Sequence, residues 1–367
     1  MVALLVIRKL VCTSLYQLFS TNTYFFNNQT VIGFSPNRIS NPDLSWERTR
    51  QFDAGVDLGV LNNRVTLTFD AYYKETSDLL LNVPIPYTTG QSTALQNYGV
   101  VSNRGIELGV STQNVKTDKF NWTTNLVYSL NRNKVESLGD GVDYIISGQS
   151  IAKVGHALGS FYGYKSVGIY QTGEATPGSI KYADINGDGK ITQDGDRVVI
   201  GNAQPKFLAG LTNNFYYKNF DLSIFFYASY GNKVFNQNRQ QLEQLNGGQN
   251  ASTAALERWT STNPSNSMPR PFEDAAPIVS DRFVEDASFL RLKNIVLGYT
   301  LPAQLLKRTH FGNVRFYIAA QNILTLTKYT GFDPEVSRNE QSTLTQGVDY
   351  GVYPNSKSYQ VGLNVTF

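Results

Sequence analysis

The stretch DINGDGKITQDGD is the local pattern in this sequence with the most specific chemical meaning. Asp184, Asn186 and Asp188 place side-chain oxygens at positions one, three and five of a loop, a spacing that suits a hard cation. Gly189 at position six permits a sharp turn, and Lys190 at position seven offers its backbone carbonyl. These positions predict a calcium-type loop.

The end of this loop departs from the calcium pattern. Position twelve, where a bidentate acid would complete the shell, is Gly195. Asp194 and Asp196 flank it, and either carboxylate closes the shell if the loop bulges by one residue. No helices flank the loop, so it is not an EF-hand. The alternative is an Asx-turn that binds no metal. Calcium is the one cofactor that the sequence predicts.

Nothing in the sequence indicates catalysis. The single cysteine, Cys12, excludes an internal disulfide, and the two histidines, His156 and His310, lie far apart without a motif around them. No Ser/His/Asp set, glycosidase-like carboxylate pair or glycine-rich phosphate loop is visible. Charge is nearly balanced, at 32 basic against 29 acidic residues, so a nucleic-acid partner is not expected. We therefore expect a protein that is not an enzyme.

The dominant pattern is alternation of apolar and polar residues in segments of about ten residues. Such alternation predicts antiparallel strands with one apolar and one polar face. Nine segments carry it: 51–60, 64–74, 105–111, 120–131, 206–218, 219–229, 287–301, 313–323 and 358–367. The residues predicted to face a watery interior are Asp53, Asp57, Thr66, Asp70, Asn121, Asn125 and Asn213.

Three further features favour strands that cross a bilayer. The segments have the length of tilted membrane strands, and aromatic residues gather near their ends. The connections alternate between short ones (61–63, 114–119, 218–219, 302–312) and long ones (75–95, 132–206, 231–288, 324–356). No run of about 18 apolar residues predicts a membrane helix. The fold class is therefore all-β, an antiparallel transmembrane barrel segment with short periplasmic turns and long extracellular loops.

Counting the strands assigns each connection to one side of the membrane. The assignment holds only if 132–206 contains an even number of crossings, most simply none, so the strand-like segment 161–171 belongs to the extracellular surface. In the other long loops, 237–257 predicts a small helix or two around a Gly-Gly break. Arg291 and Lys293 are expected to face the lumen, and 332–340 (FDPEVSRNE) is expected to be a solvated loop.

Three segments in this order resemble the SusC/RagA family of TonB-linked outer-membrane transporters of Bacteroidetes-type bacteria. They are 41–81 (NPDLSWERTRQFDAGVDLGV and onward), 184–207 (DINGDGKITQDGDRVVIGNAQPKF) and 281–302 (DRFVEDASFLRLKNIVLGYTLP). The resemblance implies the C-terminal part of a 22-stranded barrel with a plugged lumen in the cell outer membrane. Residues 1–40 are then a truncated start and an extracellular loop, and 41–367 are barrel.

The resemblance also implies partners. A SusD-like surface lipoprotein would cover the long loops, and TonB would act through an N-terminal part that this chain lacks. The substrate would be a glycan or a peptide. Loop aromatics that would stack on such a ligand, or else simply pack the loops, are Tyr162, Tyr164, Tyr170 and Trp259.

The last strand ends on an alternating row. It consists of Tyr359, Val361, Leu363, Val365 and Phe367. In the family such a strand looks like the signal read by the barrel-assembly machinery, and its apolar side would face outer-membrane lipid. The alternative is an ordinary buried edge strand that ends in Phe.

Nine strands leave two unpaired edges in lipid, so we expect the chain alone not to transport. A passive or adhesive outer-membrane barrel, or a soluble calcium-binding β-sandwich, would share the alternation.

Overall fold

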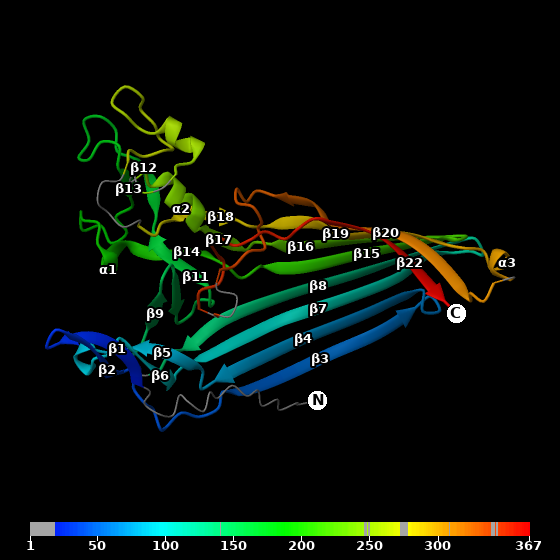
Figure 1. Ribbon diagram of the computed structural model, residues 1–367, viewed down its shortest axis with the longest axis horizontal. Coiled ribbons are helices and arrows are strands. Elements are labelled where there is room, and N and C mark those ends of the chain that lie inside the picture. Colours follow the sequence, from blue (N-terminus) through cyan, green and yellow to red (C-terminus); the bar gives the residue numbers. More distant parts are fainter. Residues whose placement is uncertain are drawn as a thin grey trace.

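The computed structural model describes the chain except for residues 1–18, 140, 246–247, 249, 272–277, 308, 339–341 and 343. Figure 1 shows a long, curved sheet with an irregular, loop-rich region at one end. Nine strands form this sheet in the order β22-β20-β19-β16-β15-β8-β7-β4-β3. Their bounds are β3 Arg48–Val60, β4 Val65–Ser77, β7 Val100–Lys116, β8 Phe120–Ser137, β15 Phe207–Tyr217, β16 Phe220–Tyr230, β19 Phe289–Thr300, β20 Asn313–Thr327 and β22 Ser358–Thr366.

The nine predicted crossing segments are therefore confirmed. Every neighbouring pair is antiparallel, and the spatial order of the strands is their order in the sequence. β8 and β15 are direct neighbours although about 70 residues separate them in the chain, so the described part of 132–206 contains no further strand of this sheet. The strand-like segment 161–171 pairs in small sheets at the loop-rich end, as expected.

The two faces of the large sheet differ as the alternation predicts. Cross-strand pairing aligns Val56 with Phe69, Phe69 with Leu108, and Leu108 with Tyr128 on one face. Apolar side chains on this face stay exposed, with Val56 at 53% and Val361 at 87%. A soluble sandwich would bury such a face under a second sheet. The soluble sandwich is therefore wrong, because an apolar surface of this extent needs a lipid environment.

The predicted face is wrong for one residue, Asn213. Asn213 pairs with Thr124 and lies on the apolar face beside the Phe215–Trp122 pair. Its neighbour Asn214 pairs with Thr123 on the polar face instead. Two adjacent asparagines do not fix the phase of the alternation, whereas the register of the sheet does. The other six residues predicted to face the interior do lie on the polar face.

The connections are short at one end of the sheet and long at the other (Figure 1). At the short-turn end, Leu61 accepts a hydrogen bond from the backbone of Arg64, and helix α3 (Ala303–Leu306) joins β19 to β20. No helix in the described parts of the chain is long and apolar enough to span a bilayer.

The long connections form small sheets and helices of their own. The strands are β1 Phe19–Phe26, β2 Gln29–Pro36, β5 Leu80–Pro84, β6 Thr93–Asn97, β9 Tyr144–Ser147, β10 Ser150–Lys153, β11 Ser160–Tyr164, β12 Ser166–Ile169, β13 Ile180–Tyr182, β14 Arg197–Asn202, β17 Lys233–Asn236, β18 Val284–Asp286 and β21 Val348–Asp349. The helices are α1 Gln193–Asp196 and α2 Gln237–Glu243, with 3-10 turns at Tyr87–Thr89, Thr253–Glu257 and Asp281–Phe283. The helical turns predicted within 237–257 are thus present.

The buried clusters lie in this loop region and at the adjoining ends of the long strands. Phe161, Phe235 and Val348 come from three different long connections and pack together at 0–1% exposure. A second cluster forms around Val135 and Leu138. Burying each such side chain contributes about 1.5–3 kcal/mol, so the loops form a folded cap on the sheet.

Candidate functional site

The polar face of the sheet carries ion pairs that bridge strands. Arg315 of β20 pairs with Asp221 of β16, although β19 lies between them. The bridge passes over Gly298, where a Cβ would lie 2.4 Å from atoms of both side chains. A glycine on the middle strand is therefore what allows a charged pair to lie flat against the wall.

A second ionic cluster ties a long loop to this wall. Arg291 of β19 is 2% exposed, and its Nη2 donates to Asp333 Oδ1 at 2.5 Å. Its Nη1 donates to Glu335 at 2.8 Å, and its Nε donates to Thr325 at 2.9 Å. Lys293 also forms an ion pair with Glu335. Arg291 and Lys293 therefore lie on the polar face, as expected.

The prediction that FDPEVSRNE is a solvated loop is wrong for Asp333 and Val336, which are buried, while Phe332 and Arg338 are exposed. Asp333 is 3% exposed because its carboxylate is folded against Arg291. Burial raises the pKa of Asp333, but hydrogen bonds from the backbone N–H of Glu335, from Arg291 and from the backbone N–H of Asn355 outweigh it and lower the pKa overall. Asp333 therefore stays ionised at neutral pH and keeps the loop anchored.

A cavity of about 390 Å³ lies between the wall and this anchored loop. The wall contributes Leu208, Tyr227, Ser229 and Phe289, and the loop contributes Pro334 to Ser337 with Gln346 and Gly347. The four wall residues belong to the polar face. The cavity therefore opens on the side of the sheet that encloses the interior of a barrel.

The predicted calcium loop has the sharp turn that the motif requires. The Asp184 carboxylate accepts from the backbone N–H groups of Gly187 and Gly189 at 2.7 and 2.8 Å. Asn186 and Asp188 are adjacent, with the Asn186 amide donating to Asp188 at 3.1 Å. Gly189 has φ +79°, the left-handed conformation that favours glycine.

The two acids at the end of the loop have different positions. Asp196 is fully buried, and its carboxylate accepts hydrogen bonds from the backbone N–H groups of Thr192 and Ile185. These hydrogen bonds lower the pKa of Asp196 and connect the two ends of the loop. Asp194 is exposed and remains the acid available to a cation. Within the described residues, no three His, Cys, Asp or Glu side chains gather closely enough to hold a metal. A calcium shell here would therefore depend on Asn186 and on the Lys190 carbonyl as well.

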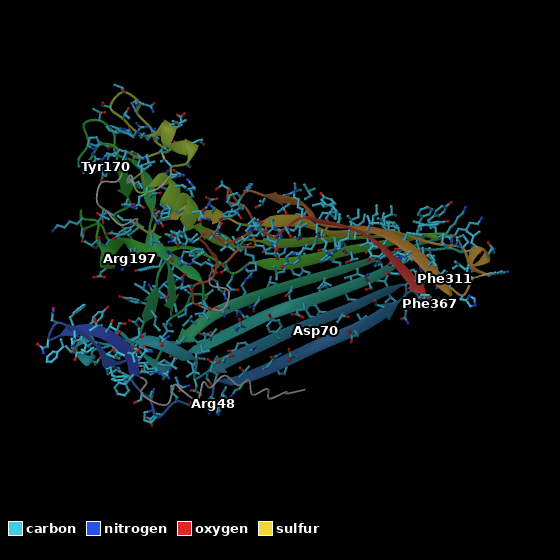
Figure 2. The ribbon with its side chains drawn as sticks, in the orientation of Figure 1. Arg48, Asp70, Tyr170, Arg197, Phe311 and Phe367 are labelled. Atoms are coloured by element: carbon cyan, nitrogen blue, oxygen red, sulfur yellow. The ribbon has the colours of Figure 1, made fainter. Side chains whose placement is uncertain are left out.

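The candidate stacking aromatics all have contacts within the chain. Tyr164 is 9% exposed and packs on Tyr182 at 5.2 Å between ring centroids, so it is a loop-packing residue. Tyr162 lies under Arg197, and Tyr170 lies under Lys181. Trp259 donates from its indole to Gln171. Figure 2 shows Tyr170 and Arg197 in the cap, far from the short-turn end. In the described residues no two of these four rings stack on each other, and their role in binding a ligand stays a prediction.

The terminal row lies on the last strand of the sheet. Tyr359, Val361 and Phe367 are 74–88% exposed on the apolar face. Phe367 contacts Phe311 at 5.5 Å at the short-turn end, as Figure 2 shows. In the described residues, β22 and β3 each pair with one strand of the sheet, so both edges are open. The assembly role of the row stays a prediction.

A family model described as "TonB dependent receptor-like, beta-barrel" matches residues 13–323. TonB-dependent receptor P3 of Formosa agariphila is 37% identical over 95% of this chain and 37% of its own length. TonB-dependent receptor SusC of Bacteroides thetaiotaomicron is 33% identical over 89% of this chain and 32% of its own length.

A solved structure of the RagAB peptide transporter superposes with a TM-score of 0.81 at 28% identity, over 96% of this chain and 39% of that chain. The chain thus spans about two-fifths or less of the length of these proteins.

We predict that Arg291→Met releases the 328–357 loop from the wall. The change leaves Asp333 buried without its partner, which costs about 3–5 kcal/mol. Limited trypsin digestion at pH 8 should then cut after the exposed Arg338 at least tenfold faster. Lys293→Met is the matched control, because Lys293 is partly exposed and its pair with Glu335 is weak. Equal cleavage rates in the two variants would contradict the anchoring role.

Proposed function

The chain belongs to the TonB-dependent receptor family and is part of an outer-membrane β-barrel. From this we propose that it forms part of the wall of an energy-dependent importer. The observation that carries the proposal is the two-faced sheet. Its apolar face suits lipid, while its polar face carries the Asp221–Arg315 bridge, the Arg291 cluster and the cavity. Substrate would pass along this polar face.

The intact receptor would take up glycan or peptide fragments with a SusD-like lipoprotein. The support for this partner is the folded cap, whose strands and helices offer a structured surface at the extracellular end. TonB would act on a plug supplied outside this chain. A peptide is supported as cargo by the related solved structure, which is named a peptide transporter.

The chain alone would not transport. Within the described residues, the outward backbone N–H and C=O groups of β3 and β22 are unpaired at the two edges of the sheet, and hydrocarbon does not tolerate unpaired edges. Further strands of the intact receptor would pair with both edges and close the barrel.

The proposal predicts uptake that depends on energy. Cells that express the intact receptor should accumulate labelled oligopeptide or oligosaccharide, and a protonophore or loss of TonB should reduce accumulation at least tenfold. In proteoliposomes, the 367-residue chain alone should give no conductance. Uptake that is insensitive to the protonophore would favour a passive or adhesive barrel instead. Conductance by the chain alone would contradict the need for further strands.

Calcium in the 184–196 loop is a separate proposal. It is supported by the turn at Gly189 and by the adjacent oxygens of Asn186 and Asp188. A bound ion would rigidify the cap and would have no catalytic role.

Isothermal titration of the intact receptor should detect calcium at millimolar concentration or below, and Asp184→Asn with Asp188→Asn should abolish that heat. Asp118→Asn, in an exposed short turn, is the control. No heat from the unmodified receptor would end the calcium proposal.

A further inference from the structure

A chain of polar side chains crosses the lipid-facing side of the sheet near its short-turn end. Thr112 donates to Asn114 at 2.9 Å on β7, and the Asn114 amide donates to Thr124 of β8 at 2.7 Å. The Thr124 hydroxyl donates to Asn213 Oδ1 of β15 at 2.7 Å. Asn114 reaches this face because the register of β7 shifts between Gln113 and Val115.

The orientation of the Asn213 amide follows from its neighbours. The Trp122 indole also donates to Asn213 Oδ1, at 3.0 Å. An indole N–H can only donate, so the oxygen of Asn213 must face Trp122 and the NH₂ group must point away. Within the described residues, no protein acceptor meets that NH₂ group. The lipid-facing surface therefore presents a hydrogen-bond donor that needs an acceptor oxygen.

The depth of Asn213 suits the polar boundary of the bilayer. Asn213 is four residues from Tyr217, the last residue of β15. At a rise of about 3.3 Å per residue and a tilt of about 40°, this separation is roughly 10 Å along the membrane normal. The Trp122–Phe215 stack, at 5.6 Å between centroids, lies between the two levels as an interfacial aromatic pair. At this depth, lipid headgroups give way to ester carbonyls and then to acyl chains.

A cationic site lies just outside this level. Lys218, in the turn after β15, holds its ammonium 5.4 Å from the centroid of the Tyr217 ring, and Tyr217 belongs to the apolar face. Its backbone N–H donates to the carbonyl of Lys119 in the neighbouring turn, and both lysines are exposed. Lysines at this position attract phosphate.

We propose that a phospholipid of the periplasmic leaflet binds across β8 and β15. Its phosphate lies at the Lys218 ammonium, and an ester carbonyl accepts from the Asn213 NH₂ group. An amide donor at the carbonyl level with a cation at the headgroup level matches the order of groups along one lipid molecule. The site is independent of the transported substrate, because it lies on the outside of the wall.

The test is native mass spectrometry of the intact receptor titrated with dioleoyl phosphatidylglycerol. Asn213→Leu should weaken lipid binding about three- to tenfold, the effect of one hydrogen bond. Lys218→Gln should weaken it about fivefold, and this loss should shrink with added salt. Asn214→Leu, on the polar face of the same strand, is the matched control and should bind as the unmodified receptor does.

A lipid without the ester tests the contact without relying on a variant that folds. The diether analogue lacks the carbonyl, so the unmodified receptor should bind it about three- to tenfold more weakly than the diester. Asn213→Leu should then lose nothing further with the diether lipid. Equal affinity of the unmodified receptor for diester and diether would overturn the proposal. So would equal losses in Asn213→Leu and Asn214→Leu.

Discussion

The absence of water in the hydrocarbon core is the constraint on which the rest of this structure depends. Each backbone N–H and C=O at membrane depth must pair with a neighbouring strand, so the nine strands form one continuous antiparallel sheet. Because successive side chains of a strand point to opposite faces of the sheet, they alternate between lipid and lumen. The same constraint is the reason for the proposal that further strands pair with β3 and β22, whose outer edges are open within the described residues. It also explains why a polar side chain such as Asn213 needs partners on the lipid side.

Outside the membrane the chain is organised by a different force. The cap has a conventional buried core, in which Phe161, Phe235 and Val348 meet from distant connections. Where the cap contacts the sheet, an ion pair joins them: Arg291 of the sheet pairs with Asp333 of the last long loop, and both side chains are buried. Burial of this pair requires that both partners stay ionised and hydrogen-bonded. Ion pairs from Arg291 therefore hold the described part of the last long loop against the polar face of the wall.

The sequence predicted what short-range periodicity encodes. Nine strands, their faces and the absence of a crossing in 132–206 follow from alternation and connection length. The face of Asn213 was missed because two adjacent asparagines hide the phase, which only cross-strand register reveals. Asp333 was missed because its partner is 42 residues away, and Asp221 is 94 residues from Arg315. The predicted strand order could have indicated the Asp221–Arg315 bridge. No local sequence pattern indicates that Asp333 contacts Arg291.

Labelling with a bilayer-restricted photoprobe, in cells that carry the intact receptor, tests the central assignment most directly. The probe reacts only with side chains that contact acyl chains. The account predicts modification at Val56, Phe69, Leu126 and Leu363, and none at Asp57, Asp70 or Asn125 on the opposite face. Unmodified residues in the first group, or labelled residues in the second, would contradict the assignment of the two faces.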